Sequence, residues 1–287
     1  MVVPGARGPV SRSQARSQSR SLGKARFDSI YDRPDPRSYF ERLAPLEYEI
    51  PHHAQEIFRR TAAARAALYD GRTEPPAVLD LCCSYGINAA LLNHEVTLAE
   101  LYAHYTSDEA LGLTTDELAR HDKEFYAERR RPQTFPVYGL DIAGRAVDYA
   151  QRAGLLDGAF TENLEQGLPG TELRRALDRV GLITLTGGGS YLTERTFTAL
   201  LGAIRRPLWV SAFVLRTVSY DPIARVLAEH GLPTTADPTG TYPQRLFTDD
   251  EEQRYAIEAV RALGGDPAGR EEAGRFHTTL YESRRGR

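Results

Sequence analysis

The chain contains only two cysteines, one methionine and one tryptophan among its 287 residues. Cys82 and Cys83 are sequence neighbours, so they cannot join distant segments by a disulfide, and they lack the spacing of a zinc site. We expect both to be reduced packing residues. Lysine occurs only at Lys24 and Lys123, and this preference for arginine indicates nothing about function.

Long apolar segments are also missing. No stretch approaches the roughly 20 residues that cross a bilayer, and the N-terminus has no apolar core of a secretory signal. We therefore expect a cytoplasmic protein without a membrane partner. The sequence has no HExxH, no GxSxG, no P-loop and no metal-spaced cluster, which argues against hydrolytic, phosphoryl-transfer and zinc chemistry and predicts no metal.

The charge is unevenly distributed. Residues 1–26 carry six basic residues and no acidic one, so the formal charge of −3 leaves −9 for the remainder. This segment is predicted to be a disordered basic tail. It could touch nucleic acid or resemble a transit peptide, but a solvated extension is favoured. The acidic remainder argues against a nucleic-acid substrate.

The rest of the chain, 41% hydrophobic over the whole sequence, predicts one catalytic domain. Residues 27–53 combine several prolines with aromatic residues and are predicted to form a cap. This cap either covers a ligand pocket or packs its aromatics on the outside of a sheet. Residues 54–287 then form the main domain, with a helical insertion at about 95–134 that contains two capping boxes, Thr97 with Glu100 and Thr114 with Glu117.

Helices and strands are predicted to alternate along the main domain, which indicates an α/β fold with a doubly wound, mostly parallel, seven-stranded sheet. The expected strands span residues 77–81, 136–140, 159–162, 180–185, 207–218 and a final alternating strand from 276. Helices are expected at residues 54–69 and 86–94, at two places in the insertion, after Asp141 and after a cap at Thr193. A last helix is expected to begin at a capping box of Thr248 and Glu251 and to end near residue 263.

The most informative segment is VLDLCCSYGINAALL, residues 78–92. A buried strand ends at Asp80 and turns through the small residues Cys82, Ser84 and Gly86 into a helix. Small side chains let a backbone approach a ligand closely, and a helix N-terminus attracts anions. Alone, the pattern also fits one β-α unit of any doubly wound protein.

This pattern resembles the first motif of class I S-adenosylmethionine (SAM) dependent methyltransferases, an acid-x-Gly-x-Gly-x-Gly sequence, with Cys and Ser in place of the first two glycines. The resemblance implies a class I methyltransferase-like Rossmann fold in which Asp80 holds the ammonium of SAM. The cofactor carboxylate would lie at the turn near residues 86–88.

The second strand is predicted to end at Asp141, followed by Ile142. In the resembling family an acid at this strand tip accepts hydrogen bonds from both ribose hydroxyls. A dinucleotide enzyme would also use an acid here, usually about 20 residues after the glycine turn, a spacing closer to Asp108. No strand precedes Asp108, so we assign the ribose to Asp141 and attribute the longer spacing to the insertion. A surface turn is the alternative for Asp141.

Two further segments complete the predicted site. Asn163 and Leu164 follow the third strand where the family places its adenine contact, although an Asn turn explains them nearly as well. Thr186 opens TGGGSY, whose glycines would approach the sulfonium. Tyr191 is the leading catalytic candidate, and Tyr31 and Tyr48 could help to enclose the cation. Alternatively, the loop is only flexible and Tyr191 only fills the core.

The predicted activity is SAM-dependent methylation of a small metabolite on oxygen or nitrogen, with S-adenosylhomocysteine as product. His52, His53 or His277 could act as a general base, though a structural role is favoured for each. The alternatives are an enzyme that cyclises SAM to azetidine-2-carboxylate and methylthioadenosine, a SAM-binding regulator, and a nicotinamide dehydrogenase. The sequence leaves the oligomeric state open.

Overall fold

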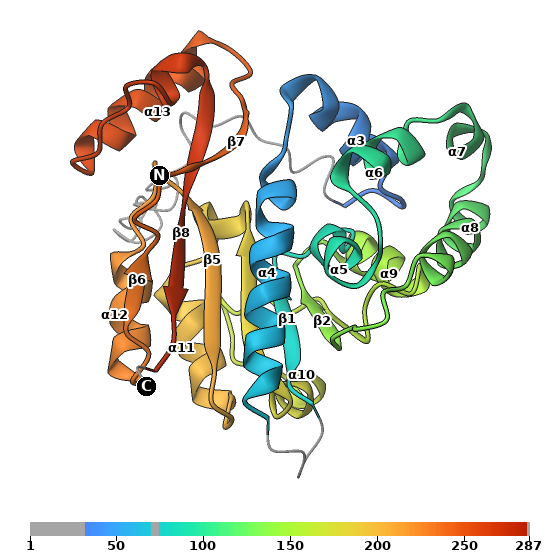
Figure 1. Ribbon diagram of the computed structural model, residues 1–287, viewed down its shortest axis with the longest axis horizontal. Coiled ribbons are helices and arrows are strands. Elements are labelled where there is room, and N and C mark those ends of the chain that lie inside the picture. The colour runs from blue at the N-terminus through green and yellow to red at the C-terminus, as the bar shows by residue number, and fades with distance from the viewer. Residues whose placement is uncertain (1–31, 70–74, 286–287) are drawn as a thin grey trace, which may run out of the picture.

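The computed structural model describes residues 32–69 and 75–285 (Figure 1). The predicted basic tail and Tyr31 lie outside the described residues. None of the described helices is both long and apolar enough to cross a membrane.

A single eight-stranded sheet forms the centre of the molecule, with strand order β3-β2-β1-β4-β5-β8-β6 and with β7 paired to β8 (Figure 1). Strands β1 to β5 are parallel, whereas β8 is antiparallel to β5, β6 and β7. The strands are β1 Ala77–Leu81, β2 Val137–Leu140, β3 Gly158–Phe160, β4 Val180–Thr186, β5 Trp209–Leu215, β6 Thr234–Ala236, β7 Tyr242–Leu246 and β8 Arg275–Ser283. The predicted α/β fold with a doubly wound, mostly parallel sheet is confirmed.

The sheet has eight strands rather than the predicted seven because β8 is long. The nine residues of β8 are enough to pair with two further strands in succession. Strand β7 pairs with Arg275 to Thr278, and β6 pairs with Tyr281 to Ser283. Pro243 and the register shift beside it are typical of an edge strand, which is why the sequence pattern around 242–246 gave no strand signal.

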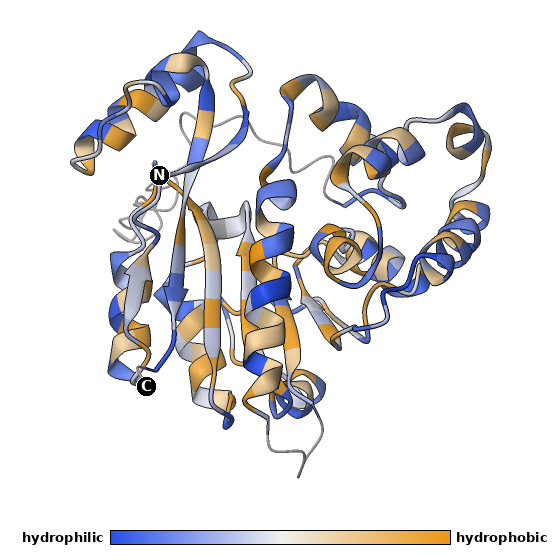
Figure 2. Cartoon of the chain, viewed as in Figure 1, coloured by the Kyte–Doolittle hydropathy of each residue, from blue (hydrophilic) through white to orange (hydrophobic). Residues whose placement is uncertain are grey.

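Helices lie in front of and behind the sheet (Figure 1), and the central strands carry many hydrophobic residues (Figure 2). One core contains buried residues of the cap, α4, α5, the insertion and α9, a second contains those of α10, α11 and α12, and a small third cluster joins Leu215, Ala256 and Phe276. Strands β1, β2 and β4 are buried along their whole length, as expected for parallel strands covered on two sides. The helices are α3 Arg37–Leu43, α4 Ile50–Ala67, α5 Ile87–Asn93, α6 Leu98–Tyr105, α7 Asp108–Gly112, α8 Thr115–Glu128, α9 Gly144–Arg152, α10 Thr171–Leu177, α11 Glu194–Ala203, α12 Asp221–Glu229 and α13 Asp250–Ala262.

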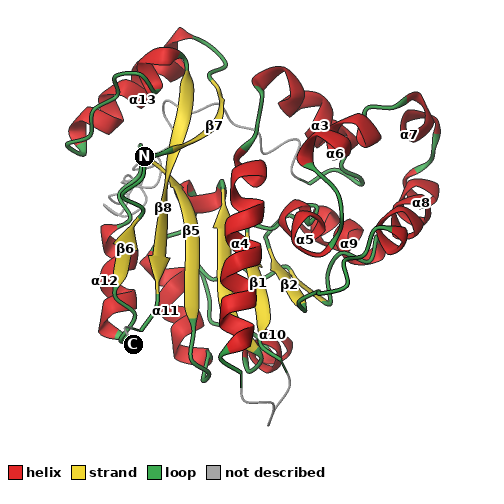
Figure 3. Ribbon diagram, in the orientation of Figure 1, coloured by secondary structure: helices red, strands yellow, loops and turns green. Residues whose placement is uncertain are grey.

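The cap and the insertion pack on each other at one end of the sheet (Figure 3). Phe40 of α3 stacks on Tyr105 of α6 at 4.6 Å and meets Tyr102 edge to face at 5.0 Å. The Tyr102 hydroxyl also donates to the backbone oxygen of Tyr48, at 3.0 Å. The ring of Phe40 and the backbone of Tyr48 are therefore held by the insertion.

Both capping boxes of the insertion are present as predicted. The capping box predicted at Thr248 and Glu251 is wrong. Asp249 caps α13 by accepting from the amides of Glu251 and Glu252, at 3.0 and 2.9 Å. Glu252 closes the motif at the amide of Thr248, because a buried ion pair with Arg245 fixes its carboxylate there. The fifth strand is also shorter than predicted, and α4 starts at Ile50 rather than at 54.

Candidate functional site

The turn between β1 and α5 has the backbone conformation of a glycine-rich loop. Cys82, Ser84 and Gly86 have φ values of 54°, 48° and 75°, so each alternate position is left-handed. A side chain in this region costs about 1–2 kcal/mol relative to glycine. Cys82 and Ser84 therefore adopt a left-handed conformation that glycine would adopt at a lower cost in stability.

Asp80 lies at the tip of β1 and is 1% exposed. Its carboxylate accepts from the Asn88 amide at 3.0 Å and from the Thr184 hydroxyl at 2.8 Å. Burial raises the pKa of Asp80 to about 7, against these two hydrogen bonds, which lower it. Asn88 also donates to the Thr186 hydroxyl at 2.9 Å and so joins the tips of β1 and β4. Direct contact between Asp80 and a ligand ammonium stays a prediction.

Asp141, at the tip of β2, turns toward the loop. One carboxylate oxygen accepts from the Ser84 amide at 2.9 Å, and the other accepts from the Ala143 amide at 3.0 Å. Burial raises the pKa of this carboxyl above its ordinary value. Two amides leave lone pairs on both oxygens. The side chain of Ser84 is buried too, and its hydroxyl oxygen has no hydrogen-bond partner among the described residues.

The residues predicted to lie near the adenine differ in exposure and in hydrogen bonding. Ile142 follows Asp141 and is 70% exposed, which leaves an apolar side chain beside the carboxylate. Leu164 is buried in the core. The side-chain oxygen of Asn163 accepts from the Glu165 amide at 3.0 Å, so the Asn turn that competed with the adenine role is present.

The glycine loop after β4 contacts both the first turn and the cap. A Cβ placed on Gly188 would lie 2.4 Å from the Cys82 sulfur, and one on Gly187 would lie 2.7 Å from the Tyr48 hydroxyl. The loop therefore needs glycine for these close approaches. Tyr48 is thus brought to the carboxyl end of β4, whereas the side chain of Tyr191 is 54% exposed and does not fill the core.

The thiols of the two cysteines have raised pKa values. Burial, with Asp141 and Asp80 nearby, raises the pKa of the Cys82 thiol well above its usual value, and the same factors act on Cys83. Both are free thiols. Because the thiolate is the reactive form, the raised pKa values favour the predicted packing role over a nucleophilic one.

The histidines proposed as bases lie around β7 and β8. The backbone oxygen of His277 accepts from Arg216 at the end of β5, at 3.1 Å. Burial, together with several arginines, lowers the pKa of His277 to about 4, so it is neutral at pH 7. Burial also lowers the pKa of His53, whose ring lies 6.0 Å from that of Tyr242. His52 is exposed.

Several residues that hold this site together were missed from the sequence. They share one property, which is a polar contact between segments far apart in the chain. Tyr85 both donates to and accepts from the backbone of Arg33, at 3.1 and 2.9 Å, and so ties the cap to the loop. Glu165 accepts from the amide and hydroxyl of Thr193 and the hydroxyl of Thr196. Only Asn88 had a signal in the sequence, since it lies in the predicted turn near residues 86–88.

No family model and no curated protein matches the sequence. Solved structures similar to this chain include the YcgJ protein from Bacillus subtilis, at 10% identity and a TM-score of 0.45, over 82% of this chain and 100% of that one. Magnesium protoporphyrin IX methyltransferase from Synechocystis with bound S-adenosylhomocysteine aligns at 14% identity and a TM-score of 0.37, over 95% and 94%. The plantazolicin methyltransferase BamL aligns at 11% and 0.44, over 95% and 99%. Identities and TM-scores this low say nothing about the reaction of this chain.

Proposed function

We propose that this chain is a SAM-dependent methyltransferase that acts on oxygen or nitrogen of a small metabolite and releases S-adenosylhomocysteine. The observation that carries the proposal is the paired geometry of two strand tips. Three alternating left-handed residues form a glycine-like loop after β1, and Asp141 at the tip of β2 accepts from the amide in the middle of that loop. In open α/β sheets, ligands bind at such carboxyl ends.

The residues at these tips fit an adenosyl group. The free lone pairs of Asp141 suit two ribose hydroxyls, and the exposed side chain of Ile142 offers an apolar surface to a base. The buried Ser84 hydroxyl lacks a partner, which is costly unless a ligand supplies one. Asn163 and Leu164 would border the adenine, with Asn163 using its remaining hydrogen-bonding groups.

The cofactor supplies an activated methyl group, so this chain has mainly to position an acceptor. Gly187 and Gly188 let the backbone after Thr186 come close to the reacting atoms, beside the Tyr48 hydroxyl. We assign Tyr48 a place against the sulfonium, with Tyr191 and Tyr31 as further candidates. His277 remains a candidate base: its low pKa keeps it unprotonated at pH 7 but also makes it a weak proton acceptor.

The test is calorimetric titration of the full chain with SAM, S-adenosylhomocysteine and NAD. We expect the first two to bind and NAD not to bind. Asp141→Asn should weaken SAM binding at least tenfold, about 1.4 kcal/mol, because it replaces one carboxylate oxygen by an amide donor. Asp148→Asn is the matched control, since Asp148 lies on the exposed side of α9.

Tight NAD binding, or equal SAM affinity in the two variants, would overturn the assignment. Incubation with SAM alone, followed by mass spectrometry, separates methyl transfer from cyclisation. Methylthioadenosine in the absence of an acceptor indicates cyclisation. Turnover only after addition of hydroxyl or amine acceptors supports methyl transfer, and binding without turnover under any acceptor indicates a regulator.

A further inference from the structure

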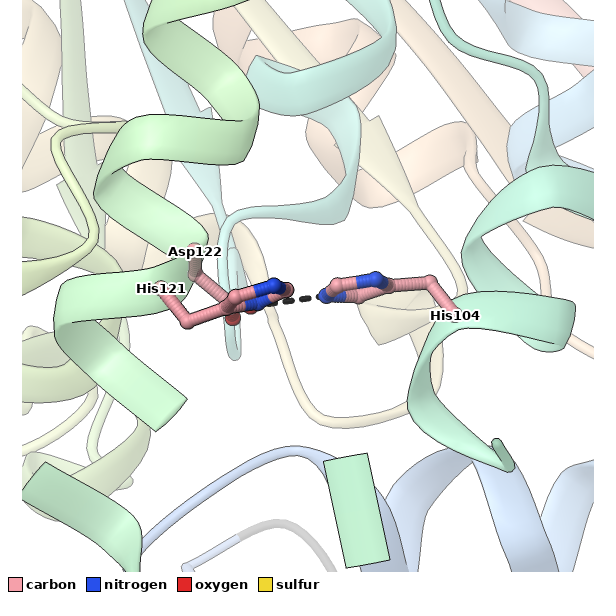
Figure 4. A group of neighbouring side chains, drawn as sticks. All are labelled: His104, His121 and Asp122. Atoms are coloured by element: carbon pink, nitrogen blue, oxygen red, sulfur yellow. Dashed lines mark hydrogen bonds and ion pairs between the residues drawn. The ribbon is translucent and has the colours of Figure 1, made fainter. Parts of the chain in front are cut away.

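The insertion contains a cluster of metal-ligating side chains that none of the sequence motifs predicted. His104 lies in α6, and His121 and Asp122 are adjacent in α8. One nitrogen or oxygen of each lies within 4.8 Å of the others. Figure 4 shows the two histidine side chains extending toward one another from their separate helices, with Asp122 beside His121.

The Asp122 carboxylate is oriented for this cluster. One of its oxygens, Oδ2, accepts from the hydroxyls of Tyr105 and Tyr149, each at 2.6 Å. These bonds hold the carboxylate so that Oδ1 is directed to the histidines. The Nε2 atom of His104 lies 2.7 Å from Oδ1, and the Nδ1 atom of His121 lies 3.8 Å from it.

His121 carries the signal for a ligand. Its Nδ1 atom is buried and has no hydrogen-bond partner among the described residues, although it faces Oδ1 of Asp122. A structural histidine–aspartate pair needs only His104, which already donates to Oδ1. The Nδ1 atom of His121 is buried 3.8 Å from the same oxygen, too far for a hydrogen bond, so an ion between the two atoms would give this nitrogen the partner it lacks.

Zn²⁺ fits the donor set and the spacing. Zinc binds imidazole nitrogen at about 2.0–2.1 Å and carboxylate oxygen at about 2.0–2.2 Å, which in a tetrahedral site places donor atoms about 3.3 Å apart. The two distances to Oδ1, 2.7 and 3.8 Å, lie on either side of that value. His121 is 36% exposed, so its side chain can shift and an ion can enter from solvent.

We propose that His104, His121 and Asp122 bind one Zn²⁺ ion through His104 Nε2, His121 Nδ1 and Asp122 Oδ1. The ion takes the place of the Nε2 proton of His104: in a neutral His104 that proton moves to Nδ1, and a protonated His104 releases one proton to solvent, so the bound imidazole is neutral in either case. Three protein ligands leave one position for water. Tyr105 and Tyr149 hold the carboxylate from behind, as outer-shell partners of metal ligands commonly do. The ion thereby joins α6 to α8.

The test is calorimetric titration of the full chain, freed of metal with a chelator and dialysed, with Zn²⁺. We expect one ion per chain. His121→Ala should weaken binding at least tenfold, and it removes no hydrogen bond of the described structure, so the variant should fold. His230→Ala is the matched control because it removes an exposed histidine that directly follows α12, and it should bind Zn²⁺ as the parent does.

Co²⁺ supplies a second measurement, since a tetrahedral site gives intense visible absorption. The parent and His230→Ala should show it, and His121→Ala should lose it. Absence of stoichiometric binding in the parent overturns the proposal, as does equal Zn²⁺ affinity in the parent and His121→Ala, which would indicate adventitious binding elsewhere. Because SAM is absent from these titrations, their outcome does not depend on the proposed methyl transfer.

Discussion

Asp80, at the tip of β1, and Asp122, in α8, are both buried carboxylates, exposed by 1% and 0%, but their surroundings differ. Asp80 accepts from two side chains, Asn88 and Thr184, and its pKa is raised to about 7. Asp122 accepts from three side chains, those of His104, Tyr105 and Tyr149. With few donors to offset burial, the carboxyl of Asp80 keeps a raised pKa, whereas the carboxylate of Asp122 holds together the helices that carry its donors.

The comparison predicts its largest effect at Asp122. Asp122→Ala should lower the free energy of unfolding by about 4 kcal/mol, because it leaves two tyrosine hydroxyls and His104 buried without their acceptor. Urea denaturation of the metal-free chain measures this. Asp122→Asn should recover part of the loss, since it keeps one acceptor oxygen. A loss below about 1 kcal/mol in the alanine variant would contradict the organising role.

Asp80 should show its environment through pH. Its folded-state pKa lies above the unfolded value, so the stability it contributes is present at low pH and is lost as pH rises from about 4 through 7. The free energy of unfolding of the parent, relative to that of Asp80→Asn, should fall by about 3 kcal/mol over this range. Urea midpoints at several pH values measure the difference. Asp148→Asn, which changes an acid that is 66% exposed, is the control and should show no comparable slope.

Substitutions of Ser84 should have the smallest effect on stability, and they test whether the loop after β1 is strained. Ser84→Gly and Ser84→Ala both remove the unpartnered hydroxyl, but only glycine relieves the left-handed φ of 48°. We expect the free energy of unfolding of Ser84→Gly to exceed that of Ser84→Ala by about 1 kcal/mol, measured by thermal or urea unfolding. The reverse order would mean that residue 84 is not left-handed in solution.

Local patterns predicted much of the fold. The strand at Ala77–Leu81 matches its predicted bounds, both capping boxes of the insertion are present, and Thr193 caps α11 as expected. Each of these depends on residues within about one turn or one strand. The predicted capping box at the start of α13 was wrong because the ion pair with Arg245, in β7, fixes the position of the Glu252 carboxylate.

The sequence predicted which residues lie at the strand tips of the candidate site, but it did not predict the contacts between them. Asp80, Ser84 and Asp141 were named from the sequence, and the structure brings Ser84 and Asp141 together. Thr184 and Tyr85 were missed because their partners lie far away in the chain, and Asn88 was placed in the turn without its contacts to Asp80 and Thr186. The histidine–aspartate cluster was missed for the same reason, since 18 positions separate His104 from Asp122 and no spacing rule links them.

The sequence by itself determined where the buried strands run, where two insertion helices begin and which small residues form the turn after β1, because periodicity, capping and side-chain size act locally. The tertiary structure decided that Asp141 faces the Ser84 amide, that β8 holds two partners along one edge, and that two helices bring three metal-ligating side chains together. These contacts depend on how distant segments pack, and packing is a property of the whole chain.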